Sequence, residues 1–514
     1  MHDRRRRAAL ILAAAAAAAA CVAVVPSASA ATARPAGSAQ RLAAGNPWGR
    51  AQEVPGTAAL NKGDFAGITS VSCASAGNCS AGGYYTDRSV RKVFVVSEVH
   101  GTWRKAEEVP GTGPLNNGHK AGIAAVSCAS AGNCSAGGWF RGVGVGGSQR
   151  KEAFVVSEVH GTWRKAEEVP GTAALNKEGH AQVTSVSCAS AGNCVAGGYY
   201  ASGHRANGAY GSQAFVVSEV RGTWRKAEEV PGTAALNVWN GAGIASVSCA
   251  SAGNCSAGGY YVGVARNVAR AFAVSEVNGT WRKAERVTVP SADLGFNPVI
   301  ASVSCGSAGN CSAGGWYLTC GPGGAPGCAG IDGSPQAFVV SEVNGTWRKI
   351  EDVPGDAALN TGQYDQITSV SCASAGNCSA GGYYFDASLA IHPFVVSEVN
   401  GTWQTAEEVP GDAALNTGGN ARITSVSCAS AGNCSAGGDY TSGSAGGLDI
   451  VHAFVVSEIN GTWQTAEEVP GTAALSKGRG ARITSVSCGS AGHCSAGGYY
   501  LVHSGSEAFV ANRK

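Results

Sequence analysis

The chain has 514 residues, of which 44% are hydrophobic and 14% are charged, and it contains 75 glycines and 19 cysteines. This composition is too apolar and too rich in cysteine for a disordered protein. The near balance of 37 basic and 35 acidic residues predicts neither nucleic acid nor an anionic membrane surface as a partner. Because single hydrophobic cores rarely extend to this length, we expect several domains or a repeated architecture.

The N-terminal segment is typical of an export signal. Arg4–Arg7 precede an apolar run from Ala8 to Val25, and Ala28–Ala30 forms a small-residue cleavage site. We therefore expect residues 1–30 to be a signal peptide, residues 31–46 a disordered lead-in and residues 47–514 the folded part of a secreted protein. An uncleaved membrane anchor is the alternative, but the run consists mostly of alanine and is weakly hydrophobic.

Eight copies of one unit fill the rest of the chain. The first cysteine follows the opening tryptophan by 25 residues, or 24 in the fifth copy, and the second cysteine follows six residues later. The distance from there to the next phenylalanine varies between 15 and 27 positions, so each unit has a constant framework and one variable connection. The units begin at Trp48, Trp103, Trp163, Trp224, Trp281, Trp347, Trp403 and Trp463.

Each unit is predicted to form four β-strands. In the third copy, Val183–Cys188, Cys194–Tyr200, Phe215–Val220 and Trp224–Val230 are short runs rich in β-branched and aromatic residues. Asn-Gly pairs such as Asn278-Gly279 predict a tight hairpin between the third and fourth strands. Paired glutamates on the fourth strand suit an exposed sheet edge, since charges discourage pairing with another chain.

Eight such antiparallel units predict an all-β, eight-bladed β-propeller. The segment Trp48–Val54 has the pattern of the fourth strand of a unit, although no first, second or third strand precedes it. In the eighth unit, the third strand begins at Phe509 and no fourth strand follows it. We therefore expect the N-terminal strand to complete the last blade and close the ring. An open solenoid is the alternative, but it requires polar capping repeats at its ends.

The two cysteines of each unit flank the bend between the first two strands, where facing side chains can meet disulfide geometry. Zinc binding is the competing interpretation, but the pairs lack the usual four ligands, and only His493 accompanies one of them. We predict one disulfide per blade, one extra pair in the longest variable loop, and neither a metal nor a cofactor. The pairs are Cys73–Cys79, Cys128–Cys134, Cys188–Cys194, Cys249–Cys255, Cys305–Cys311, Cys320–Cys328, Cys372–Cys378, Cys428–Cys434 and Cys488–Cys494.

The variable connections, which join the second strand to the third, are predicted to share one face of the ring. Binding residues tend to lie on variable loops of a rigid scaffold, although solvated loop tips are the alternative. No catalytic residue is predicted. The candidate ligand-binding residues are Trp139, Arg141, His204, Arg205, Tyr210, Arg266, Trp316, Asp386, His392, Asp449 and His452.

The second strand ends in an aromatic pair, such as Tyr84-Tyr85, in every unit except the seventh, which has Asp439-Tyr440. Neighbouring strand residues point to opposite faces. Exposed rings can stack on sugars, whereas buried rings fill the space beside the preceding Ala-Gly-Gly between blades. Both interpretations stay open at this point.

The turn Ser275–Trp281 resembles the Asp-box of sialidase-type propellers, but it is one residue shorter and Val277 replaces the defining aspartate. The arginine cluster and the Tyr/Glu nucleophile that a sialidase would imply fall on no motif of this chain. More broadly, the Ser-Cys…Cys-x-Ala-Gly-Gly…Gly-Thr-Trp unit resembles repeats of secreted bacterial β-propeller proteins without an assigned activity. That resemblance covers Trp48–Lys514 and implies a fold rather than a reaction.

The sequence therefore predicts a secreted, monomeric binding module that presents its variable loops to an extracellular cell-wall, polysaccharide or protein ligand. An extracellular glycosidase or lyase is an alternative suggested by fold analogy alone, and a structural envelope protein is another. Catalysis is disfavoured because the prominent carboxylates recur in every unit and do not mark one site.

Overall fold

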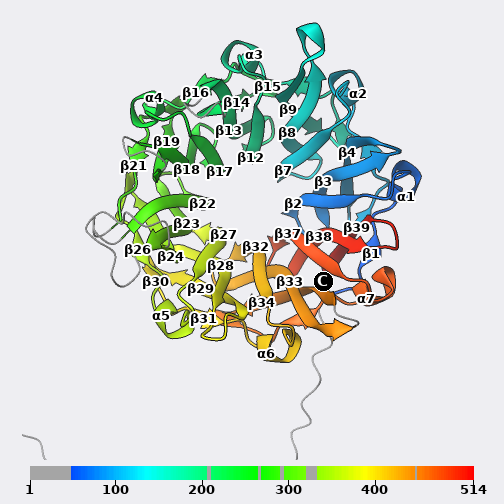
Figure 1. The fold of residues 1–514 in the computed structure, drawn as a ribbon, viewed down its shortest axis with the longest axis vertical. Helices are drawn as coiled ribbons and strands as arrows, with labels where there is room; N and C mark the ends of the chain where they lie inside the picture. The colour runs from blue at the N-terminus through cyan, green and yellow to red at the C-terminus, as the bar shows by residue number, and fades with distance from the viewer. Residues whose placement is uncertain (1–47, 205–209, 264–267, 290–294, 320–332, 446–447) are drawn as a thin grey trace, which may run out of the picture. The chain divides into compact units, whose positions relative to one another are not determined.

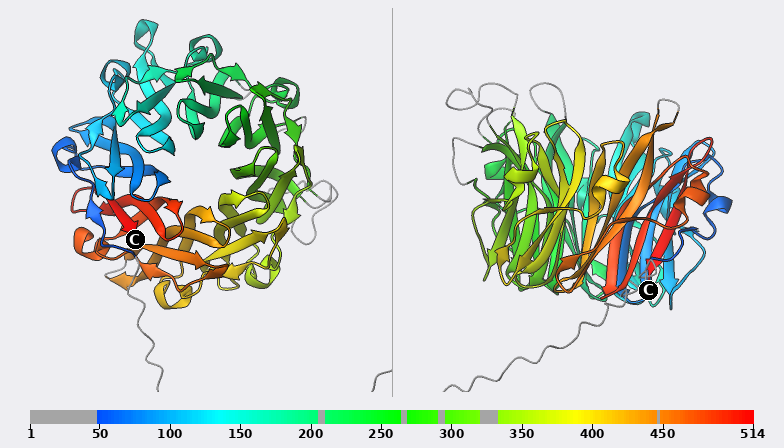
Figure 2. Two further views of the ribbon diagram at one scale, coloured as in Figure 1. Left: turned by 180° about the vertical axis from the view of Figure 1, so that it is seen from behind. Right: turned by 90° about the horizontal axis from the view of Figure 1, so that it is seen from below.

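The computed structural model describes residues 48–204, 210–263, 268–289, 295–319, 333–445 and 448–514. These residues belong to one compact unit, Asn46–Lys514, and the predicted signal peptide and lead-in lie outside the described residues. Within this unit, eight antiparallel sheets form a ring, and their strands run from one face of the ring to the other (Figures 1 and 2). The predicted all-β, eight-bladed propeller is confirmed.

The first strand of each blade is innermost, and first strands of neighbouring blades contact one another around the centre (Figure 1). These strands are β2 (Gly67–Ser75), β7 (Ala121–Ser130), β12 (Gln182–Ser190), β17 (Gly243–Ser251), β22 (Gly295–Ser307), β27 (Asp365–Ser374), β32 (Ala421–Ser430) and β37 (Ala481–Ser490). The second strands are β3 (Asn78–Asp87), β8 (Asn133–Val143), β13 (Asn193–His204), β18 (Asn254–Val262), β23 (Asn310–Thr319), β28 (Asn377–Phe385), β33 (Asn433–Ala445) and β38 (His493–Leu501).

The third strand lies between the second and the outer strand and is buried on both faces, as in Val93–Val96. Its apolar run without alternation is typical of such a covered strand. The third strands are β4 (Val90–Val99), β9 (Gln149–Val159), β14 (Tyr210–Val220), β19 (Ala269–Val277), β24 (Ser334–Val343), β29 (Ile391–Val399), β34 (Leu448–Ile459) and β39 (Ser506–Arg513).

The outer strand differs from the prediction, because it consists of two short pieces rather than one continuous strand. Between the pieces, the amide of Ala106 leaves its own sheet and donates to the carbonyl of Pro55 in the preceding blade (2.7 Å). This bond ties neighbouring blades together and interrupts the strand. The pieces are β5 (Thr102–Trp103), β6 (Glu107–Glu108), β10 (Thr162–Trp163), β11 (Glu167–Glu168), β15 (Thr223–Trp224), β16 (Glu228–Glu229), β20 (Thr280–Trp281), β21 (Glu285–Arg286), β25 (Thr346–Trp347), β26 (Glu351–Asp352), β30 (Thr402–Trp403), β31 (Glu407–Glu408), β35 (Thr462–Trp463) and β36 (Glu467–Glu468).

Single-turn helices in the connections to the next blade were not predicted from the sequence. Each follows a glycine in the left-handed region, such as Gly111 with φ 82°, a conformation that a side chain disfavours. The hydroxyl of Thr112 then donates to the carbonyl of Val109 (2.7 Å) and fixes the turn. The helices are α1 (Thr57–Leu60), α2 (Thr112–Leu115), α3 (Thr172–Leu175), α4 (Thr233–Leu236), α5 (Asp356–Leu359), α6 (Asp412–Leu415) and α7 (Thr472–Ser476), and the 3-10 turn η1 spans Val145–Gly147.

The hydrophobic core is divided among the contacts between neighbouring blades. The Ala-Gly-Gly segment of the second strand permits these contacts. A Cβ atom on Gly82 would meet the side chains of Ile123 and Val126 in the next blade at 2.8–3.0 Å, and one on Gly83 would meet the Gly67 carbonyl oxygen at 2.1 Å. Both positions therefore exclude any larger residue without a shift of the backbone or of the neighbouring blade.

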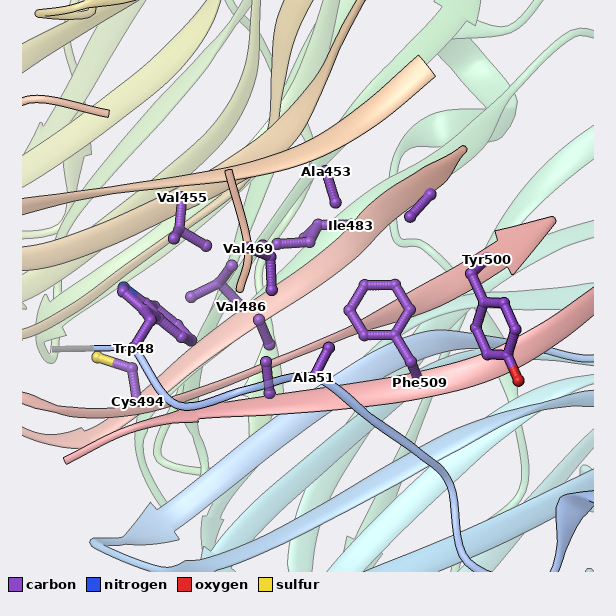
Figure 3. Packing of buried hydrophobic residues seen from close by; sticks show 13 residues of the cluster. Trp48, Ala51, Ala453, Val455, Val469, Ile483, Val486, Cys494, Tyr500 and Phe509 are labelled. Atoms are coloured by element: carbon purple, nitrogen blue, oxygen red, sulfur yellow. The ribbon is translucent and has the colours of Figure 1, made fainter. Parts of the chain in front are cut away.

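The ring is closed by the N-terminal strand β1 (Gln52–Glu53), which pairs antiparallel with β39 in the last blade. Gln52 lies opposite Val510 and Glu53 opposite Phe509. Trp48 is 3% exposed and packs in the cluster shown in Figure 3, which joins the last two blades. The predicted closure is confirmed.

Disulfides hold the bend between the first and second strands in all eight blades. Cys73 lies directly opposite Cys79 in the strand register and is bonded to it, and the same pairing recurs in each of the other seven blades. These eight predicted bridges are confirmed, and they fit an oxidising compartment. The pair Cys320–Cys328 lies outside the described residues.

We expect the double substitution Cys73→Ser and Cys79→Ser to lower the free energy of unfolding by about 2 kcal/mol, because a bridge that closes so short a loop restricts the unfolded chain only modestly. Denaturant unfolding, monitored by tryptophan fluorescence, measures the change. The matched control is the corresponding pair of substitutions at Cys128 and Cys134, which should cost a similar amount. Loss of all native structure in either variant would contradict this estimate.

Candidate functional site

The two faces of the ring differ in construction. The amide of Gly101, in the turn before the outer strand, donates to the Gly77 carbonyl in the turn between the first two strands (2.8 Å). These turns form one face, which we call the constant face. At the other end, the Gly63 amide in the connection between blades donates to the Thr86 carbonyl beside the variable loop (2.8 Å). We call this end the variable face.

Pockets lie on the constant face between neighbouring blades. A cavity of about 450 Å³ separates the first and second blades, and one of about 460 Å³ separates the third and fourth. In the first of these, the Glu158 carboxylate accepts hydrogen bonds from Ser97 (2.9 Å) and Ser80 (3.1 Å) of the preceding blade. Burial raises the pKa of Glu158, and the two serine hydroxyls oppose that shift. This glutamate therefore connects two blades through hydrogen bonds.

Most blades repeat this connection, but three contacts depart from it, one of them because Asn512 replaces a serine and donates to Glu98. Val195 stands where the other units have serine, so Oε2 of the buried Glu276 has no hydrogen-bond partner among the described residues. In the last blade, Arg513 replaces the glutamate and donates to the Ser435 hydroxyl (3.3 Å). Because the same carboxylate and serines recur around the ring, the constant face is best explained as framework.

On the variable face, the predicted residue Trp139 lies beside Lys151 of its own blade, and Lys151 also contacts residues of the next blade. Lys151 Nζ lies 4.9 Å from the Trp139 ring centroid and 5.7 Å from the Tyr199 ring centroid. It donates to the Gln182 side-chain oxygen and to the Tyr199 hydroxyl (3.4 Å). The His180 ring stacks on Tyr199 with centroids 5.8 Å apart. We call these five residues the Lys151 cluster.

The Lys151 cluster is positively charged and only partly covered. Burial and then the charge of Arg141 lower the pKa of Lys151 to about 8. Burial lowers the pKa of His180, and Lys151 and Arg141 lower it further. Trp139, Lys151, His180 and Tyr199 all keep part of their surface exposed. The cluster therefore offers aromatic faces beside a cation that is incompletely hydrated.

The first ring of the aromatic pair has a similar setting in other blades. The Arg91 guanidinium lies 4.1 Å from the Tyr84 ring centroid, and that of Arg422 lies 5.3 Å from the Tyr383 centroid. The second ring is buried, as in Tyr85, which is 1% exposed. The second ring is therefore buried, as the packing interpretation predicts, and the first ring is only partly exposed. In the seventh unit, Asp439 replaces the first ring and pairs with Arg482 (3.3 Å).

A second group of predicted residues meets in the sixth blade. His392 Nε2 lies 3.5 Å from the Asp386 carboxylate, and His392 Nδ1 lies 2.7 Å from the Asp412 carboxylate. The Tyr384 hydroxyl donates to Glu408 (2.5 Å). Burial lowers the pKa of His392, but Asp412, Glu408 and Asp386 together raise it above its usual value. Sequence reasoning did not single out Glu408 or Asp412, although Asp412 stands where five units have threonine.

The other predicted residues do not form one site. His452 contacts the Ser442 hydroxyl (2.9 Å) and the Glu468 carboxylate (3.5 Å) in the seventh blade. Asp449 is exposed on the same strand, three residues away, so the alternation of the strand places it on the opposite face.

Arg141 donates to Gln149 on the variable loop (2.8 Å), and Trp316 is half-buried on β23. His204 and Tyr210 face each other in the strand register, but their side chains lie outside the described part. Arg205 and Arg266 also lie outside it. The predicted residues are therefore divided among several blades.

No protein-family model and no curated protein matches the chain. Among solved structures, a protein of unknown function from Dyadobacter fermentans is 11% identical with a TM-score of 0.39, over 90% of this chain and 97% of that one. Sqt1 of Chaetomium thermophilum, bound to the N-terminus of ribosomal protein L10, is 10% identical with a TM-score of 0.42, over 85% and 96%. The β-propeller domain of the Trilobed protease of Pyrococcus furiosus is 6% identical with a TM-score of 0.39, over 79% and 98%.

At such low identities, the matches concern the fold alone, and they assign neither a family nor an Asp-box to this chain. In the described part of the chain, no helix is long and apolar enough to cross a membrane. The chain is therefore an eight-bladed β-propeller whose function has to be argued from its own side chains.

Proposed function

We propose that this protein is a secreted binding module that holds an extracellular acidic polysaccharide on its variable face, with the Lys151 cluster at the centre of the site. The observation that carries the proposal is the position of Lys151 between the partly exposed rings of Trp139 and Tyr199, which belong to neighbouring blades. Sugar rings stack on aromatic faces, and a cation beside them selects sugars with a carboxylate.

The electrostatics support an anionic ligand over a neutral one. Burial lowers the pKa of Lys151 because the folded protein solvates its ammonium group incompletely. A carboxylate placed near Nζ would favour the charged form and make a charge-assisted hydrogen bond. Arg141 lies close enough to lower the same pKa, so it adds positive charge to the site. A neutral glycan would gain the stacking alone.

A panel of polysaccharides with and without uronic acids, immobilised for binding measurements, tests the proposal. We expect the protein to prefer the acidic members, and we expect Lys151→Ala to weaken that binding by about tenfold or more, because it removes a charge-assisted hydrogen bond. Trp139→Ala should weaken acidic and neutral members alike by roughly threefold to tenfold. Binding should also weaken as the pH rises through about 8, where Lys151 loses its charge.

The matched control is Lys165→Ala, which removes an exposed lysine beside the outer strand at the constant face. This variant should bind like the unmodified protein. Unchanged binding after both Lys151→Ala and Trp139→Ala, or an equal loss in Lys165→Ala, would refute the proposed site.

A further inference from the structure

The sixth blade contains a group of metal-ligating side chains on the variable side of its outer edge. His392 lies on β29, Glu408 on β31, and Asp412 is the first residue of α6. One ligand atom from each of these three residues lies within 4.8 Å of those of the other two. Among the described residues, no other group of three histidine, cysteine, aspartate or glutamate side chains meets this condition.

We propose that His392, Glu408 and Asp412 bind one divalent transition metal ion, with zinc as the preferred ion. Imidazole and carboxylate are ligands that zinc accepts, and three protein ligands leave a coordination position for water or for a ligand oxygen. His392 Nδ1 and the Asp412 carboxylate are 2.7 Å apart and share a proton in the metal-free protein. Binding would replace that proton by the ion and release it to solvent.

The surrounding residues supply the outer hydrogen bonds that orient metal ligands. His392 Nε2, the nitrogen turned away from Asp412, lies 3.5 Å from Asp386, so a carboxylate faces the far side of the imidazole. The Tyr384 hydroxyl donates to Glu408 Oε2 (2.5 Å) and leaves Oε1 for the ion. The Asn416 amide donates to the Asp412 carboxylate (3.4 Å). Each of the three ligands therefore has its own support.

The repeat provides an internal comparison. The fifth blade has Asp352 and Asp356 at the carboxylate positions but Gln336 at the histidine position. The seventh has His452 and Glu468 but Thr472 at the position of Asp412. Only the sixth unit combines all three ligand types.

Asp412 also departs from the local framework of the repeat. The hydroxyl of Thr472 donates to the carbonyl of Val469 (2.8 Å), a bond that an ionised aspartate cannot make. The Asp412 side chain is only 2% exposed, and a buried carboxylate is costly unless it is paired. His392 and the Asn416 amide already contact it, and a metal ion shared with His392 and Glu408 would compensate its charge further. The inference does not depend on the proposed polysaccharide site, because it concerns a different blade and different residues.

Zinc binding to the full chain, purified without a histidine tag and dialysed against a chelator, tests this inference. Equilibrium dialysis with zinc chloride should give one ion per chain. Asp412→Thr and His392→Gln should each lose this binding by at least about 100-fold, because each removes a direct ligand. Both substitutions install residues that other units of this chain carry, so the fold should be preserved. Asp386→Asn, which alters only the outer support, should weaken binding by about 10- to 100-fold.

The controls are His452→Gln in the seventh blade and Asp356→Thr in the fifth, which should leave the stoichiometry at one. Circular dichroism and thermal unfolding without metal should show that every variant is folded. Absence of zinc binding by the unmodified chain would overturn the inference. If Asp412→Thr and His392→Gln bound zinc as tightly as the unmodified chain, the inference would be overturned as well. Loss of zinc binding in the two controls would have the same consequence.

Discussion

A chain that lacks residues 1–54 should fail to form the closed ring, with a loss of more than about 5 kcal/mol in the free energy of unfolding. The deletion removes the buried side chains of Trp48 and Val54, which are 3% and 0% exposed. It also removes the Gly49 amide that donates to Asn512 (2.7 Å) and leaves the edge of β39 unpaired. An unpaired edge strand is a template for association, so the product should also aggregate.

Thermal unfolding and size-exclusion chromatography measure this effect. The matched control is a chain that lacks only residues 1–45, which should melt like the full-length protein and elute as a monomer. A synthetic peptide covering residues 46–56 should restore part of the stability of the longer deletion, since it supplies the missing strand. Equal melting temperatures for the two truncated chains would show that β1 does not hold the ring closed.

Asp365 should make the protein less stable as the pH rises from about 4 to about 8. This residue is 0% exposed and stands where most other units have alanine. Burial raises the pKa of Asp365 to about 8, and the neighbouring Asp356 carboxyl adds to the shift, while the Ala337 amide opposes it. The unfolded chain releases the same proton near pH 3.9. Folding therefore binds a proton between these values, and the free energy of unfolding must fall as the pH rises through this range.

Each pKa unit corresponds to about 1.4 kcal/mol. Deprotonation of this carboxyl should therefore lower the free energy of unfolding by on the order of 3 to 5 kcal/mol between pH 4 and pH 8. Asp365→Asn should remove this dependence, because the amide imitates the protonated acid and keeps an oxygen for the Ala337 amide, which lies 2.9 Å from Oδ1. The variant should therefore be more stable than the unmodified protein at pH 8, and similar to it at pH 4.

Chemical denaturation at a series of pH values between 4 and 9 measures both curves. Glu285→Gln, at an exposed carboxylate on the outer strand of the fourth blade, is the control and should leave the curve unchanged. Parallel curves for Asp365→Asn and the unmodified protein would contradict the assignment of the buried proton to Asp365.

The framework was readable from the sequence because it repeats. The constant spacing from tryptophan to the first cysteine predicted eight equal units, and the facing cysteines predicted the bridges that the structure contains. The split of the outer strand and the short helices were missed, because both depend on bonds to the neighbouring blade or on local turn geometry. The amide of Ala106 shows this dependence, since its acceptor, Pro55, belongs to another blade.

The candidate sites were only partly predictable. Trp139, Asp386 and His392 stood out because they lie in the variable connections. Lys151 and Tyr199 become one site with Trp139 only when two blades pack together, and the sequence does not state which side chains meet across that contact. A comparison of the units position by position would have found Asp412, because it replaces a recurrent threonine.

The sequence by itself determined the number of blades, the order of their strands, the pairing of eight disulfides and the closure of the ring, because periodic spacing and strand chemistry are local properties. The tertiary structure alone decided which residues meet between blades and at the outer edges. His392, Glu408 and Asp412 come from a strand, an outer strand piece and a helix, so they become neighbours only when the chain folds back on itself. Such contacts depend on packing between segments that no spacing along the chain records.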